Sequence, residues 1–300
     1  MKRRDVIKCA TASVGVALWS EHALNALSAA DQTNLVVVKN GSPEQMVRKA
    51  LQSLGGISRV VKAGQTVVIK PNMSWDRPPE MAATTNPAVV AEVVRMCLEG
   101  GAKTVMVFDR TIDSPSRCYL NSGIAKAAAA AGADVHFTRD RLFEPLKIEN
   151  AYQLKEWSFY REVLEADVLI NIPILKRHVI TPMTAGFKNM MGLIGGDRNR
   201  IHGLYDQTIV DINRILRPQL TIIDAYRALL QNGPAGGGYT GVMMMKTLVA
   251  GFDPVQVDTL GAKLMGARPK DLPYLGLAEK AGLGTTNIID PKPAEFSLSS

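Results

Sequence analysis

The sequence has 300 residues, is 46% hydrophobic, and carries 35 basic and 28 acidic side chains. This composition is typical of a globular chain with one large core or two smaller ones, and it excludes a mostly disordered protein. No block of basic residues interleaved with aromatic residues occurs, so we expect no nucleic-acid partner. The mild positive charge is better suited to binding a small anionic molecule.

The first thirty residues have the pattern of an export signal. Arg3 and Arg4 precede the apolar run Cys9–Trp19, which is too short to span a bilayer because a span needs about twenty apolar residues. The arginine pair resembles a twin-arginine signal, and small residues at 28–30 could be cleaved before Asp31. We therefore predict the twin-arginine export machinery as a partner, a periplasmic or otherwise exported location, and no stable membrane anchor.

Removal of residues 1–30 lowers the formal charge from +7 to +5 and leaves Cys97 and Cys118 as the cysteines of the mature chain. No Cys-x-x-Cys pair occurs, which excludes a thiolate-bound zinc or iron–sulfur site of the usual spacing. We expect the two cysteines to be unpaired, since Cys97 lies on the apolar face of a predicted helix. The histidines and strand-end aspartates form no compact metal motif, so the sequence does not support a metal site, although it does not exclude one, and it leaves the cofactor unknown.

Short apolar strands alternate with helices along most of the chain. The predicted strands span residues 35–38, 66–70, 104–108, 134–137, 168–172, 220–223 and 247–250. The predicted helices span residues 43–54, 86–99, 123–131, 184–191, 207–216, 253–265 and 272–281, and residues 150–161 are less regular. This alternation predicts an α/β fold with a mostly parallel sheet flanked by helices. Two arrangements fit it: two lobes, residues 31–150 and 151–300, with a cleft between them, or one long sheet.

Polar residues follow four of the predicted strands. Lys70-Pro71-Asn72, Asp109, Asn171 with Lys176, and Asp224 each stand at or just beyond a strand's carboxyl end. Ligands of open parallel sheets bind beyond that edge. The sequence therefore predicts a ligand site where these strand ends meet.

Ammonium and amide groups on converging loops are suited to holding a carboxylate or a phosphate. The predicted substrate-binding residues are Lys70, Asn72, Asn171, Lys188 and Asn189, and the predicted catalytic residues are His178, Asp224 and Lys176. Asp224 is favoured as a proton carrier because the glycine-rich loop 233–241 follows it, although helix capping would also explain an aspartate there. Desolvated lysines close to one another have lowered pKa values, so one of them could instead be the base.

Three segments resemble the family called domain of unknown function 362. They are Ile69–Asn72, the stretch from Asn171 to Gly192, and Asp253–Asp258. The resemblance implies a shared α/β domain in which Lys70, Asn72, Lys176, Lys188, Asn189 and Asp258 face a common site. Many relatives carry a ferredoxin-like segment with four closely spaced cysteines, which this sequence lacks.

Two hypotheses about function follow. The first is an exported enzyme acting on a small anionic substrate in a cleft lined by lysine and asparagine residues. The alternative is a periplasmic binding or delivery protein that holds a metabolite, a metal or a cofactor without chemistry. A purely structural role is disfavoured because the sequence has no repeat and no extended apolar face.

Overall fold

The computed structural model describes residues 33–178, 183–236 and 238–299. Their strands form one nine-stranded sheet, with the order β11-β1-β10-β9-β7-β2-β3-β4 and with β8 paired to β9, and a separate two-stranded sheet, β5-β6. The strands of the large sheet are β1 (Leu35–Lys39), β2 (Thr66–Pro71), β3 (Thr104–Val107), β4 (Asp134–Val135), β7 (Val168–Ile172), β8 (Ile174–Lys176), β9 (Leu220–Leu229), β10 (Val242–Gly251) and β11 (Ala294–Ser297). The small sheet pairs β5 (Phe143–Lys147) with β6 (Glu156–Tyr160).

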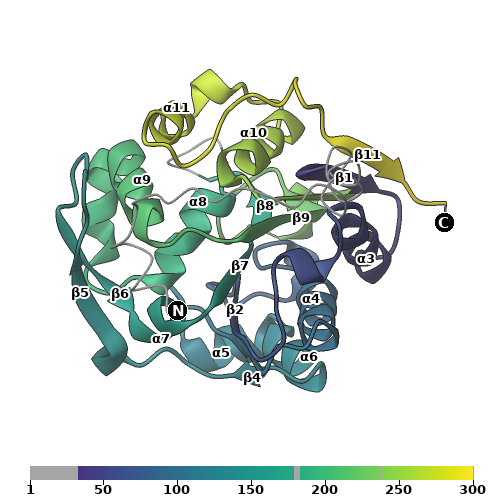
Figure 1. Ribbon diagram of the computed structural model, residues 1–300, viewed down its shortest axis with the longest axis horizontal. Helices are drawn as coiled ribbons and strands as arrows, with labels where there is room; N and C mark the ends of the chain where they lie inside the picture. Colours follow the sequence, from purple (N-terminus) through teal and green to yellow (C-terminus); the bar gives the residue numbers. More distant parts are fainter. Residues whose placement is uncertain (1–32, 179–182, 237, 300) are drawn as a thin grey trace, which may run out of the picture.

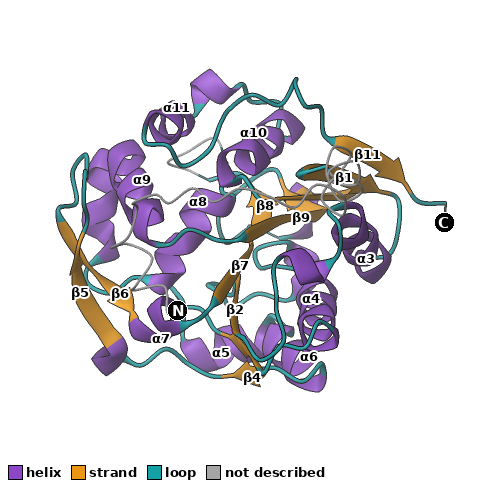
Figure 2. Ribbon diagram, in the orientation of Figure 1, coloured by secondary structure: helices purple, strands orange, loops and turns teal. Residues whose placement is uncertain are grey.

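The predicted fold class is confirmed. Within the described residues, every pairing in the large sheet is parallel except the two that β10 makes, with β1 and with β9. The helices are α3 (Pro43–Ser53), α4 (Pro87–Glu99), α5 (Pro115–Asn121), α6 (Ile124–Ala130), α7 (Arg161–Glu165), α8 (Gly186–Asn189), α9 (Tyr205–Ile215), α10 (Pro254–Leu264) and α11 (Pro273–Lys280). Helices cover both faces of the sheet, which explains why its central strands are apolar on both sides (Figure 2).

The two faces of the sheet support separate hydrophobic cores. Helices α3, α4 and α6 pack on one face, and α8, α9, α10 and α11 pack on the other (Figure 1). Along β2, Val67 and Ile69 belong to the α3–α4 core, whereas Val68 belongs to the α9–α10 core. Because side chains alternate along a strand, Lys70 points to the same face as Val68, toward α8.

The helix that follows β2 begins as its sequence predicts. The side chain of Asn86 accepts a hydrogen bond from the Ala88 amide, and Pro87 occupies the first turn, where its missing N–H costs nothing. The apolar positions of α4, including Cys97, are buried against the sheet. Both Cys97 and Cys118 are buried and unpaired.

Two expectations about the chain path were wrong. The strand expected to end at Asp224 continues to Leu229, because Arg227–Leu229 pair with the first residues of β10, Val242–Met244. Residues 150–161, expected to be irregular, include all of β6, whose partner β5 contains Pro145. Proline weakens a strand pattern in the sequence but is tolerated at the edge of a sheet.

No helix among the described residues is both long and apolar enough to cross a membrane.

Candidate functional site

Lys70 and Asn171 lie side by side on neighbouring strands. They are partners in the parallel register of β2 and β7, and both are buried on the face that α8 covers. The amide of Asn189, at the end of α8, donates to the Lys70 carbonyl at 3.0 Å and to Asn171 Oδ1 at 2.8 Å, and its Oδ1 accepts from Lys70 Nζ at 3.1 Å. These three predicted residues therefore form one hydrogen-bonded group that fixes α8 on the ends of two strands.

Asp109 provides the negative charge of this group. Its Oδ1 is 3.0 Å from Lys70 Nζ, and both side chains are almost fully buried. Its other oxygen accepts hydrogen bonds from the Met73 amide at 2.7 Å and from the Ser74 hydroxyl at 3.1 Å. Asp109 therefore connects the end of β3 to the loop that follows β2. Burial lowers the pKa of Lys70, and the nearby Asp109 carboxylate opposes this effect.

Gly192 packs directly against this ion pair. A Cβ atom placed at Gly192 would be 1.9 Å from Asp109 Oδ1 and 2.5 Å from Lys70 Cε, much closer than real atoms approach. The amide of Arg110 also donates to the Gly192 carbonyl at 2.9 Å. The glycine that follows the Asn-Met-Met sequence is thus required by a close approach and not by a positive φ.

Asp258 of α10 holds the start of α8 in place through hydrogen bonds to its backbone. Its Oδ1 accepts from the Gly186 amide at 2.6 Å, and its Oδ2 accepts from the Phe187 amide at 3.1 Å and from the Tyr274 hydroxyl at 3.0 Å. Burial raises the pKa of Asp258 to about 6, although these hydrogen bonds lower it in part. Asp258 supports the site without facing the cavity described next.

A cavity of about 150 Å³ lies beyond the carboxyl ends of β2 and β8, beside this group. Its lining contains no acidic side chain among the described residues and consists of Asn72, Ser74, Trp75, Ile112, Lys176, His178, Thr184, Lys188, Asn189, Met191, Gly192, His202 and Pro234. Five residues predicted from the sequence therefore share one cavity, namely Asn72, Lys176, His178, Lys188 and Asn189. Lys70 and Asn171 lie in the adjoining layer, hydrogen-bonded to Asn189.

The amine of Lys176 is buried without an acidic partner. The side chain is 1% exposed, and its Nζ donates to the Ala83 carbonyl at 2.6 Å. None of the ion pairs among the described residues includes Lys176 or Lys188. Burial, and after it the charge of Lys188, lowers the pKa of Lys176 to about 7. Burial alone lowers the pKa of Lys188 to about 8.

The two histidines of the cavity have lowered pKa values, which favour their neutral form. Burial first, and then the charges of Lys188 and Lys176, lower the pKa of His178 to about 3. The pKa of His202 is lowered as well, chiefly by burial, and its ring stacks on Tyr205. Near neutral pH, Lys176 is therefore better suited than His178 to exchange a proton. In the described part of the chain, no three His, Cys, Asp or Glu side chains are arranged to hold a metal ion.

Asp224 is not among the residues that line the cavity. It lies within β9 and not at a strand end, and its neighbours Ile223 and Ala225 belong to the α9–α10 core. Its own side chain therefore points to the opposite face, where Oδ2 accepts from the Asn86 amide at 2.7 Å. Asp224 therefore binds the backbone of Asn86, the N-cap residue of α4, and caps no helix after it, since β9 continues to Leu229.

Sequence reasoning missed several lining residues, above all Trp75. The ring of Trp75 lies 5.7 Å from Lys176 Nζ. Ser74 and Trp75 follow Lys70-Pro71-Asn72 after one intervening residue, Met73, so extending the strand-end motif by three residues would have found them. Pro234 also lines the cavity, which places the predicted loop 233–241 beside it.

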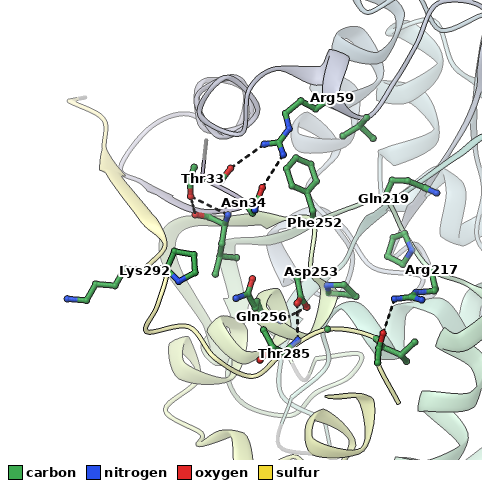
Figure 3. A pocket seen from close by; sticks show the side chains of 18 residues that line it. Thr33, Asn34, Arg59, Arg217, Gln219, Phe252, Asp253, Gln256, Thr285 and Lys292 are labelled. Carbon is green, nitrogen blue, oxygen red and sulfur yellow. Dashed lines mark hydrogen bonds between the residues drawn. The ribbon is translucent and has the colours of Figure 1, made fainter. Parts of the chain in front are cut away.

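A larger groove of about 700 Å³ lies at the opposite edge of the sheet, near the start of β1 and the end of β10 (Figure 3). Most of its polar groups form hydrogen bonds with other parts of the chain. Arg59 donates to the Leu54 carbonyl at 2.7 Å and to Asn34 Oδ1 at 3.0 Å, and it stacks over Phe252. Asp253 accepts from the first amides of α10 and from the Thr285 amide. The smaller cavity, which contains buried amines without acidic partners, is the stronger candidate site.

The fold and the site define an α/β protein with a small, basic cavity at the carboxyl edge of a mostly parallel sheet. The chain belongs to the family described as Domain of unknown function (DUF362), whose pattern it matches over residues 67–263. This range contains all the residues of the cavity and of the Lys70–Asn189 group.

Two similar proteins illustrate the relationship. The chain is 29% identical over 259 residues to a thylakoid-associated protein of Synechocystis sp., which covers 82% of this chain and 77% of that protein. The lactate racemase apoprotein from Thermoanaerobacterium thermosaccharolyticum is similar over 78% of this chain, with 12% identity and a TM-score of 0.49. This chain spans only 57% of that racemase, and the likeness is too weak to support a function.

Proposed function

We propose that this protein is an enzyme that binds a small anionic substrate in the cavity beside Lys176 and Lys188. One observation carries the proposal: the buried amine of Lys176 and the partly buried amine of Lys188 face a cavity whose described lining has no acidic side chain. Burying an amine without a counter-charge is unfavourable unless it loses its proton or gains an anion. A bound carboxylate or phosphate would provide the missing negative charge.

The same lysines supply a proton carrier. A group whose pKa lies near the working pH is an effective general acid or base, and Lys176 has a pKa of about 7. Lys188 would hold the anion, while the side-chain amide of Asn72 lies on the cavity wall, where it can orient the anion. The buried Lys70–Asp109–Asn189 group keeps the wall rigid, which favours catalysis because a reacting group must be held in place.

Calorimetric titration with acetate, phosphate and other small anions tests the site. The Lys188→Gln variant is expected to weaken anion binding at least tenfold, which corresponds to about 1.4 kcal/mol. The exposed Lys126→Arg variant is the matched control and should bind as the unchanged protein does. If no small anion binds, or if Lys188→Gln has no effect, the proposal is wrong. A metabolite released intact from native protein, with no turnover of it, would instead favour the binding or delivery role.

We further propose that the protein is exported in its folded state. Residues 1–30, which carry Arg3-Arg4, lie outside the described residues, so the proposal is supported by the sequence pattern alone. Changing both arginines to lysine should trap the protein in the cytoplasm, as measured by fractionation of the producing cells. Unchanged export of this variant would exclude the twin-arginine route.

A further inference from the structure

The Lys176 amine has the environment of a nucleophile as well as of a base. A lysine can attack a carbonyl group only through its neutral form, and desolvation next to another cation produces that form near neutral pH. Both conditions hold at Lys176. Its Nζ is buried, it has Lys188 as a cationic neighbour, and it forms no ion pair among the described residues, although the Asp109 carboxylate raises its pKa in part. The hydrogen bond that it donates to the Ala83 carbonyl restricts where the amine lies.

The cavity beside the amine is small. Its volume is about 150 Å³, and it is partly open to solvent. A small organic acid is suited to this space.

The wall of the cavity provides a place for a carboxylate. Lys188 Nζ has only weak partners in the described structure, the sulfur of Met191 at 3.9 Å and the ring of Tyr205 at 4.9 Å. His202 Nδ1 and Thr184 Oγ1 are buried and have no hydrogen-bond partner among the described residues. Leaving such buried polar atoms without a hydrogen bond costs free energy. A bound carboxylate would accept a hydrogen bond from the Thr184 hydroxyl, or from His202 Nδ1 when the neutral ring carries its hydrogen on that nitrogen.

We propose that the cavity binds a small 2-oxo acid and that Lys176 forms an imine with its carbonyl carbon. This inference rests on the proposed anion site, since Lys188 holds the carboxylate while Lys176 faces the neighbouring carbonyl. The amine nitrogen bonds to the carbonyl carbon, and the carbonyl oxygen leaves as water with the two hydrogens of the amine. No oxidant or reductant is needed. Protonation of the imine then makes it an acceptor for the electrons of an adjacent bond.

Reductive trapping tests the imine. The full-length protein is incubated with pyruvate, the simplest 2-oxo acid with a carbon side chain, and reduced with sodium cyanoborohydride, which converts an imine into a stable secondary amine. Peptide mass spectrometry is expected to find the adduct on Lys176, at least tenfold above the exposed Lys126. Acetone, which has the carbonyl but no carboxylate, should be trapped at least tenfold less.

Three variants separate the outcomes. Lys176→Arg should lose the adduct. Lys188→Gln keeps the Lys176 side chain but removes both the carboxylate partner and the neighbouring charge, so it should reduce the adduct at least tenfold even if the arginine variant fails to fold. Lys126→Arg should leave the adduct unchanged. Calorimetry could show that pyruvate binds and that Lys188→Gln weakens this binding, while no adduct forms on Lys176. This result would exclude the imine but would support the anion site. If pyruvate and the other small anions neither bind nor react, both proposals are wrong.

Discussion

Lys70 Nζ lies 3.0 Å from Asp109 Oδ1, joining the ends of two neighbouring parallel strands through a buried ion pair. Each partner has a second structural task. Lys70 donates to Asn189, and Asp109 accepts from Met73 and Ser74. The pair therefore ties α8 to the loop after β2, and these two segments provide much of the cavity lining. Four predictions concern this arrangement and the amines beside it.

Replacing Asp109 with asparagine should strongly destabilise the protein. Removing one partner of a buried pair leaves an uncompensated charge, so we expect a loss of about 3–5 kcal/mol in the free energy of unfolding. Chemical denaturation measures this loss. Glu295→Gln, which breaks the exposed pair with Lys39, is the control and should cost at most about 1 kcal/mol. Equal effects of the two variants would contradict the structural role of the buried pair.

Gly192→Ala should destabilise the protein although it adds a single methyl group. The new Cβ would overlap Asp109 Oδ1 at 1.9 Å, so the ion pair or the backbone must shift, at a cost of about 1–3 kcal/mol. Thermal unfolding reports the change. Gly203→Ala is the matched control, because its Cβ would have no neighbour within 4 Å. A Gly192 variant as stable as the control would show that the close packing at this position is not required.

Anion binding should take up protons between pH 7 and 8. In the empty cavity Lys176 and Lys188, with pKa values of about 7 and about 8, are partly neutral in this range. A bound anion favours the charged amines and raises both pKa values, so protons enter with it. Affinity should be highest below pH 7 and fall as the pH rises through 8. Calorimetry in two buffers of different ionisation enthalpy measures the uptake, and proton release on binding would oppose the assignment.

Lys188→Gln should raise the pKa of Lys176. The charge of Lys188 is the second cause of the lowered value, so its removal should shift the pKa of Lys176 from about 7 toward the ordinary 10.5. The pH dependence of cyanate labelling, followed on the Lys176 peptide, measures this shift because cyanate modifies neutral amines. Labelling of the exposed Lys126 serves as the internal reference. An unchanged profile would mean that the charge of Lys188 does not contribute to the pKa of Lys176.

Much of the fold followed from local patterns. The apolar runs at 66–70 and 168–172, and the Asn86-Pro87 start of α4, are signals that neighbouring residues create by themselves. The β5–β6 hairpin was missed because Pro145 interrupts its pattern, and the extension of β9 was missed because it depends on pairing with β10. Pairing partners distant in the sequence leave no local trace.

The candidate site divides in the same way. The sequence by itself determined which side chains stand at the strand ends and that lysines and amides dominate there, because strand ends and residue types are local properties. Only the tertiary structure decided which of them meet. Strand alternation turns Asp224 to the far face, whereas parallel register and the close packing at Gly192 bring Lys70, Asp109 and Asn189 together. Burial by distant segments then gives Lys176 and Lys188 their lowered pKa values, which residue types alone could only suggest.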